Sequence, residues 1–132
     1  MKKLTMALAV LAVILAVHSA AYTQGKNSLP VCGGITYDSS NPTHVLGTNK
    51  DDVFNSSASS VGRVIFGLNG DDTLVGSEGD DVICGGNGSD NIAGVGGNDR
   101  VFGDNGDDLV SGGRDKDEIH GGNGDDILQG AT

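Results

Sequence analysis

The feature that most constrains this 132-residue chain is a run of seven nine-residue repeats from Gly67 to Gln129. In register the repeats read GLNGDDTLV, GSEGDDVIC, GGNGSDNIA, GVGGNDRVF, GDNGDDLVS, GGRDKDEIH and GGNGDDILQ. Position 1 is glycine, position 6 is aspartate and position 8 is aliphatic in every copy. Position 4 is glycine in six copies, and Asp115 is the exception. Seven uninterrupted copies with three constant positions predict a repeat architecture.

Each repeat predicts a six-residue loop followed by a three-residue strand. The glycines permit the tight, left-handed backbone of a loop, and one inward aliphatic residue between two outward ones is the alternation of a strand. So short a strand buries nothing alone, so the copies must stack, with two repeats per coil of 18 residues. We predict an all-β fold, a parallel β-roll or right-handed β-solenoid. Its core would consist of the position-8 residues Leu74, Ile83, Ile92, Val101, Val110, Ile119 and Leu128.

The position-6 aspartates predict metal sites between stacked loops. Parallel strands lie about 4.8 Å apart, so the carboxylates of repeats n and n+2 approach within roughly 5 Å and repel each other. A calcium ion, which binds oxygen at about 2.3–2.6 Å, fits between them. Oxygen ligands without a cysteine or histidine cluster favour Ca²⁺ over zinc or copper. The candidate ligands are Asp72, Asp81, Asp90, Asp99, Asp108, Asp117 and Asp126.

The repeats resemble the RTX, or haemolysin-type, calcium-binding nonapeptide GGxGxDxUx, which residues 121–129 fit at every fixed position. The resemblance covers about half of the chain. It implies that one loop supplies its aspartate and the carbonyls of positions 2 and 4, and that the other supplies its aspartate and the carbonyls of positions 1 and 3. It implies five pairs: Asp72–Asp90, Asp81–Asp99, Asp90–Asp108, Asp99–Asp117 and Asp108–Asp126.

Carried over to this chain, the glycine carbonyl donors fall in two sets. Those at position 4 are Gly70, Gly79, Gly88, Gly97 and Gly106. Those at position 1 are Gly85, Gly94, Gly103, Gly112 and Gly121. Asp115 departs from the pattern after the last full pair, so its effect is expected only at the C-terminal end.

Residues 1–21 predict a secretory signal peptide. Lys2 and Lys3 precede an apolar run to Val17, and small residues follow, with cleavage expected near Ala21. A retained membrane anchor is the alternative, but the run is shorter than the ~20 residues that span a bilayer. RTX exotoxins use a C-terminal secretion signal instead, so the resemblance does not imply a toxin. We expect a secreted, extracellular protein.

The rest of the chain is strongly acidic. All 18 Asp and Glu residues follow residue 21, against six of the eight Lys and Arg residues, which leaves a formal charge of −12. This sign disfavours nucleic acids and anionic membranes as partners, and we expect no stable membrane insertion. Five calcium ions would nearly offset the excess. Without calcium, repulsion and the entropy of 23 glycines predict an unfolded chain, so that folding and calcium binding form one equilibrium.

Two segments precede the regular repeats, which we assign to a domain over 67–132. Residues 22–44 are rich in Ser, Asn and Thr and predict an irregular N-terminal cap on the first open coil or, alternatively, a flexible leader. Residues 45–66 predict one degenerate, metal-poor first coil, because Ser56 and Ser57 break the ninefold count by two. Asp52 occupies a position-6 place in this coil, so a further site with Asp72 is an open alternative.

Cys32 and Cys84 are the only cysteines, and an even count in a secreted chain indicates a disulfide. Cys84 is at the outward position 9, within reach of a cap that carries Cys32. Two free thiols or an intermolecular bridge are the alternatives. Short secreted RTX-like proteins similarly pair a cysteine before the roll with an ICGG sequence such as residues 83–86.

We predict a calcium-binding structural protein and no enzyme. HExxH, GxSxG and P-loop motifs are absent from the sequence. Two alternatives remain. One is an accessory or C-terminal-type module of an extracellular protease, lipase or epimerase, and the other is an adhesin or matrix component. The sequence names no protein or polysaccharide partner.

Overall fold

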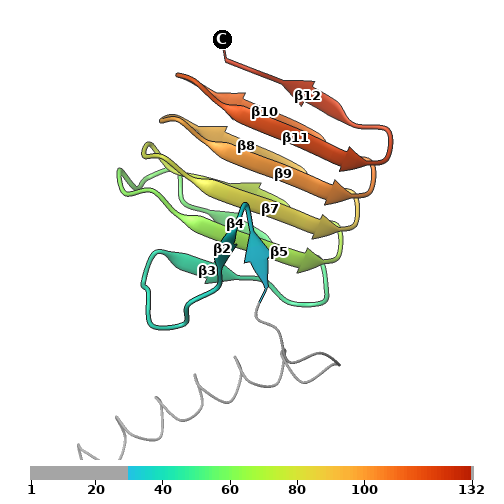
Figure 1. Ribbon diagram of the computed structural model, residues 1–132, viewed down its shortest axis with the longest axis horizontal. Coiled ribbons are helices and arrows are strands. Elements are labelled where there is room, and N and C mark those ends of the chain that lie inside the picture. The colour runs from blue at the N-terminus through green and yellow to red at the C-terminus, as the bar shows by residue number, and fades with distance from the viewer. Residues whose placement is uncertain (1–29, 132) are drawn as a thin grey trace, which may run out of the picture.

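A computed structural model describes residues 30–131 and consists of two parallel five-stranded sheets, with one antiparallel hairpin beside them (Figure 1). The chain alternates between the sheets, so each coil contributes one strand to each, and the coils stack along one axis (Figure 1). The predicted all-β parallel β-roll is confirmed. The front sheet contains β3 (His44–Leu46), β5 (Val64–Asn69), β7 (Val82–Asn87), β9 (Arg100–Asn105) and β11 (Glu118–Asn123). The back sheet contains β4 (Val53–Asn55), β6 (Thr73–Val75), β8 (Asn91–Val95), β10 (Leu109–Gly113) and β12 (Ile127–Gln129).

The register between coils keeps the position-8 side chains in two columns that face each other. Ile65 pairs with Ile83 and Ile83 with Val101, a step of 18 residues per coil. Burial of these side chains supplies most of the apolar driving force, at about 25 cal/mol per Å². Leu128, in the last coil, is 48% exposed because no further coil covers it within residues 30–131. The shared core consists of Ile65, Leu74, Ile83, Ile92, Val101 and Val110, each at most 1% exposed.

The degenerate repeats form a complete first coil. Val45 pairs with Ile65 and Phe54 with Leu74, a step of 20 residues rather than 18. The two additional residues lie in the loop between β4 and β5, where Ser56 and Ser57 interrupt the ninefold count. Val45 and Phe54 pack against the core, so residues 45–66 add one coil to the roll.

The front strands are longer than the sequence period predicts. Four of them, β5, β7, β9 and β11, have six residues, because the pairing with the neighbouring strands continues into positions 2 and 3 of the following repeat. Leu68 therefore pairs with Gly86, and Asn69 with Asn87. The expectation of a six-residue loop is wrong on this side of the roll, where the turn occupies only positions 4 to 6.

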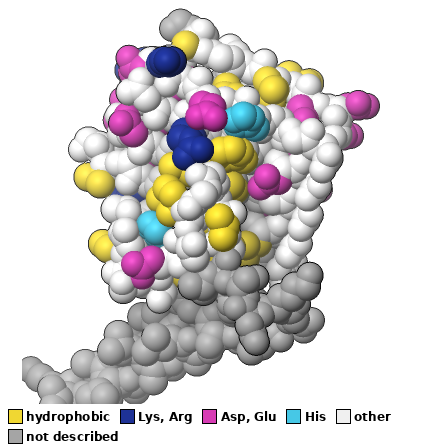
Figure 2. Space-filling view, viewed as in Figure 1, with side chains coloured by type: hydrophobic (Ala, Val, Ile, Leu, Met, Phe, Trp, Pro, Cys, Tyr) yellow, Lys and Arg dark blue, Asp and Glu magenta, His cyan; other side chains and the backbone are white. Residues whose placement is uncertain are grey.

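A short hairpin, β1 (Val31–Cys32) and β2 (Ile35–Thr36), contacts the front sheet at β5 and β7. The sequence predicts a cap on the first open coil, or a flexible leader, for residues 22–44, of which 22–29 lie outside the described residues. The hairpin within this segment lies across a face of the front sheet. The reason is a second apolar cluster on that face. Hydrophobic side chains gather along the middle of the face beside the hairpin (Figure 2). The buried members of this cluster are Cys32, Tyr37, Phe66 and Cys84, surrounded by Leu46, Val64, Leu68, Val82 and Phe102.

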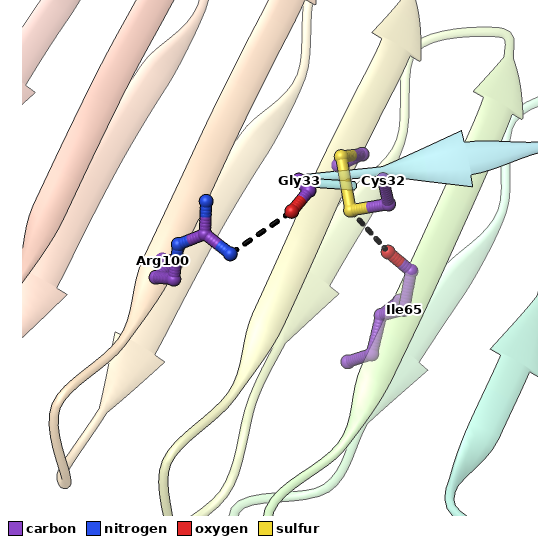
Figure 3. The surroundings of a disulfide bond; sticks show 5 residues. Cys32, Gly33, Ile65 and Arg100 are labelled. Carbon is purple, nitrogen blue, oxygen red and sulfur yellow. Dashed lines mark hydrogen bonds between the residues drawn. A yellow bond between two sulfur atoms is a disulfide. The ribbon is translucent and has the colours of Figure 1, made fainter. Parts of the chain in front are cut away.

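The predicted disulfide between Cys32 and Cys84 is present in the structure (Figure 3). It joins the hairpin to β7 with a Cα–Cα distance of 5.7 Å. Beside it, the Nη1 of Arg100 donates a hydrogen bond of 2.9 Å to the carbonyl oxygen of Gly33 (Figure 3). These two contacts and the apolar cluster fix the hairpin on the front sheet.

Replacing both cysteines by alanine is expected to lower the free energy of unfolding by about 4 kcal/mol, because the bridge closes a loop with a sequence separation of 52. Urea denaturation at saturating calcium measures the change. Val31→Ala is the matched control, since Val31 lies in the same hairpin and is 62% exposed. An unchanged unfolding midpoint for the double variant would show that the bridge adds no stability.

Candidate metal centre

The turns of the repeats line the two edges of the roll, and each turn ends on a position-6 aspartate except the one between β4 and β5, which contains no aspartate. The edge where the front strands end, here called the long edge, carries positions 1 to 6 of the repeats at residues 47–52, 67–72, 85–90, 103–108 and 121–126. The edge where the back strands end, here called the short edge, carries positions 1 to 6 at residues 76–81, 94–99 and 112–117. Five of the aspartates are at most 2% exposed although carboxylates are rarely buried: Asp72, Asp81, Asp90, Asp99 and Asp108.

One oxygen of each aspartate carboxylate links its loop to the loop one coil before. Asp72 donates its backbone N–H to Oδ1 of Asp90 at 2.8 Å, and Asp90 donates to Oδ1 of Asp108 at 2.8 Å. The same bond joins Asp81 to Asp99 at 2.9 Å on the short edge. Loops n and n+2 therefore meet at the aspartates, as the pairing inferred from the sequence requires.

The second carboxylate oxygen is the unusual feature of these loops. It is buried and has no hydrogen-bond partner among the described residues. A buried carboxylate without a compensating donor or cation costs several kcal/mol. The stacked loops therefore hold a column of negatively charged oxygen atoms that a cation would stabilise. The aspartates with an unpartnered Oδ2 are Asp72, Asp90, Asp99, Asp108 and Asp117.

Four of these five oxygens, all but that of Asp117, share a small space with a backbone carbonyl of the next coil. A Cβ placed on Gly85 would lie 2.1 Å from Oδ2 of Asp90 and 2.8 Å from the carbonyl oxygen of Gly103. A Cβ on Gly94 would lie 2.1 Å from Oδ2 of Asp99 and 2.3 Å from the oxygen of Gly112. Position 1 is glycine because these oxygens leave no room for a side chain. Carboxylate and carbonyl oxygens brought together in this way form the donor set that Ca²⁺ prefers.

Burial also makes these carboxylates hard to ionise without a counterion. Burial, together with a smaller contribution from neighbouring carboxylates, raises the pKa of Asp90 and of Asp99 to about 7. The pKa values of Asp72 and Asp108 are raised as well, again chiefly by burial. A cation beside these oxygens would reverse the effect.

Positions 2 and 4 carry the left-handed backbone that turns the loop carbonyls. At position 4, Gly88 and Gly106 each have a φ of +130°. Asp115 replaces the glycine of position 4, yet it keeps a φ of +74°. The departure noted in the sequence therefore does not change the sign of φ in its loop, although a non-glycine residue there carries backbone strain.

No group of three or more His, Cys, Asp or Glu side chains gathers within residues 30–131. This agrees with loops that offer carboxylates in pairs and draw the remaining oxygens from the backbone. The structure thus places every predicted aspartate and position-1 glycine in the loops of the two edges. The loops of Asp52 and Asp81 differ from the others, because both carboxylates have hydrogen bonds from a position-2 residue.

A ladder of asparagines along the long edge was missed in the sequence. The side-chain amide of Asn87 donates to Asn69 at 2.7 Å, that of Asn105 to Asn87 at 2.9 Å, and that of Asn123 to Asn105 at 2.8 Å. The signal was available, since position 3 is asparagine in every second repeat. These bonds hold successive loops in register independently of a metal.

No helix within residues 30–131 is long and apolar enough to cross a bilayer. Among known protein families, the model of the RTX calcium-binding nonapeptide repeat (4 copies) matches residues 64–92 and again residues 93–128. The comparisons with curated proteins and with solved structures give no match. The two matched segments coincide with the coils whose aspartates line the edges.

Proposed function

The repeat region of this chain belongs to the RTX calcium-binding nonapeptide-repeat family, and from this premise we propose a secreted protein whose folding is coupled to extracellular calcium. The repeats indicate a calcium-binding protein. The observation that carries the proposal is the column of buried Oδ2 atoms without partners. Calcium would supply positive charge beside these oxygen atoms, to which no described residue donates a hydrogen bond.

The ions would lie between loops n and n+2, at the aspartate pairs inferred from the sequence. In each pair, Oδ2 of the first aspartate faces the carbonyl of the position-1 glycine in the second loop. Asp90 and Gly103 illustrate this arrangement on the long edge. The carbonyls of positions 2 to 4 would complete an oxygen shell of the six to eight ligands that Ca²⁺ takes.

Coupling of folding to calcium follows from charge and composition. Residues 22–132 have a formal charge of −12 and contain all 23 glycines of the chain, so compaction without cations is opposed by repulsion and by chain entropy. Proteins with these repeats are typically extracellular and their rolls typically non-catalytic. We therefore propose a structural role outside the cell, after removal of residues 1–21, which lie outside the described residues.

A calcium titration of the purified protein followed by far-UV circular dichroism tests the proposal. We expect a coil-to-β transition at about 10⁻⁴–10⁻³ M calcium, and no comparable transition with magnesium, which demands octahedral geometry. A spectrum that is already rich in β-structure in chelator and does not change with calcium would contradict the coupling. Absence of bound calcium at millimolar concentrations would contradict the function itself.

A further inference from the structure

Two of the loops carry a hydroxyl residue at position 2, Thr48 in the loop 47–52 and Ser77 in the loop 76–81. At every other loop the position-2 residue has a positive φ, and none carries a hydroxyl. Thr48 and Ser77 are not among the residues with positive φ. The backbone of these two loops therefore differs from that of the others. The remaining position-2 residues, with their φ, are Leu68 (84°), Gly86 (115°), Val95 (93°), Asp104 (77°), Gly113 (110°) and Gly122 (113°).

Ser77 donates two hydrogen bonds to the carboxylate of its own loop, that of Asp81. Its backbone N–H donates to Oδ2 of Asp81 at 2.6 Å, and its hydroxyl donates to Oδ1 of Asp81 at 2.9 Å. The backbone N–H of Arg63 donates to the same Oδ1 at 2.5 Å. Ser77 is fully buried. Both oxygens of Asp81 are thus satisfied, whereas Oδ2 of Asp99, on the same edge, has no partner.

Thr48 makes similar contacts one coil earlier, on the long edge, although both of its donors go to the same carboxylate oxygen. Its backbone N–H and its hydroxyl donate to Oδ2 of Asp52 at 2.6 Å and 3.0 Å. In two loops on opposite edges, therefore, a position-2 Ser or Thr donates hydrogen bonds to the position-6 carboxylate, which the position-2 residues of the other loops do not. Neither Asp52 nor Asp81 is among the aspartates with an unpartnered buried oxygen.

We propose that Ser77 takes the place of a cation in its loop, so that the pair Asp81–Asp99 binds no calcium and the protein binds four ions rather than five. This inference rests on the proposed function and refines it. A calcium ion at Oδ2 of Asp81 would compete with the Ser77 N–H for that oxygen, and loss of this hydrogen bond would leave a buried donor without a partner. By the same argument Asp52 adds no site with Asp72. The four calcium pairs are Asp72–Asp90, Asp90–Asp108, Asp99–Asp117 and Asp108–Asp126.

Native mass spectrometry of the purified protein at saturating calcium tests the count directly. We expect four bound ions for the wild-type chain and five for Ser77→Gly, because glycine removes the hydroxyl and can adopt the left-handed backbone of the other position-2 glycines. Ser89→Gly is the matched control and should stay at four. The Ser89 hydroxyl makes no hydrogen bond within the part of the chain that the structure describes. A fifth ion in the wild type, or four ions in folded Ser77→Gly, would overturn the inference.

A second pair of variants keeps the test decisive if Ser77→Gly does not fold. Asp81→Asn should leave the count at four, whereas Asp108→Asn, which belongs to two of the proposed pairs, should lower it to two. A loss of one ion in Asp81→Asn would overturn the inference. A wild-type protein without any bound calcium would instead contradict the proposed function, so the two failures are distinguishable.

Discussion

Replacing Asp90 by asparagine is expected to raise the calcium concentration for ordering by at least about tenfold, or about 1.4 kcal/mol. Asp90 belongs to two proposed pairs, with Asp72 and with Asp108. Its Oδ1 accepts a hydrogen bond from the backbone N–H of Asp72, and its own N–H donates to Oδ1 of Asp108. The variant therefore removes a charged ligand from two sites at once. Far-UV circular dichroism during a calcium titration measures the midpoint.

In chelator the same variant is expected to have the opposite effect. The pKa of Asp90 is raised to about 7 from an ordinary value of 3.8, first by burial and then by the carboxylates of Asp72 and Asp108. At pH 8 the ionised form therefore destabilises the calcium-free roll, and asparagine relieves that cost. Because the raised pKa favours the protonated form in the folded state, the stability of the calcium-free roll falls as pH rises from about 4 to 7. Below pH 4 the benefit of asparagine should disappear.

Asp125→Asn is the control for Asp90→Asn. It removes one negative charge from the same edge, but Asp125 is exposed. If both variants shift the calcium midpoint equally, the effect is one of net charge and not of the loop geometry. If Asp90→Asn leaves the midpoint unchanged, Asp90 is not a ligand.

Replacing Gly85 by alanine is expected to abolish calcium-dependent ordering of the roll around its central coil. The added Cβ would lie 2.1 Å from Oδ2 of Asp90 and 2.8 Å from the carbonyl oxygen of Gly103. The second atom belongs to the backbone of the next coil, so the collision cannot be relieved by a rotamer change. The coils must separate, which disrupts both the register of β7 and β9 and the proposed ion site.

Gly130→Ala is the matched control for Gly85→Ala, because a Cβ there meets nothing within 4 Å. Neither glycine has a positive φ, so the comparison isolates the steric effect from backbone strain. Circular dichroism at increasing calcium and size-exclusion chromatography measure the outcome. A Gly85→Ala protein with the wild-type calcium transition would show that the tight approach of the loops is not required.

The repeat period by itself determined most of the architecture. An aliphatic residue every ninth position can be buried only if the copies stack, and Ile83 and Val101 indeed lie in adjacent coils with the register that stacking demands. The same period brought the aspartates of loops n and n+2 together, as the bond from Asp72 to Asp90 shows. These features follow from local rules that each copy repeats, so sequence reasoning reaches them.

Only the tertiary structure decided the features that depend on contacts between dissimilar segments. The hairpin could not be placed from its own residues, because its position depends on the apolar outward side chains of the front sheet, such as Phe66 and Phe102. The difference between Asp81 and Asp99 could not be read from position 6, which is aspartate in both repeats. It arises because Ser77 directs its N–H and its hydroxyl at the carboxylate of Asp81, whereas Oδ2 of Asp99 has no donor among the described residues. A constant ligand position therefore specifies where a carboxylate lies, whereas the three-dimensional arrangement of its donors decides whether that carboxylate needs a cation.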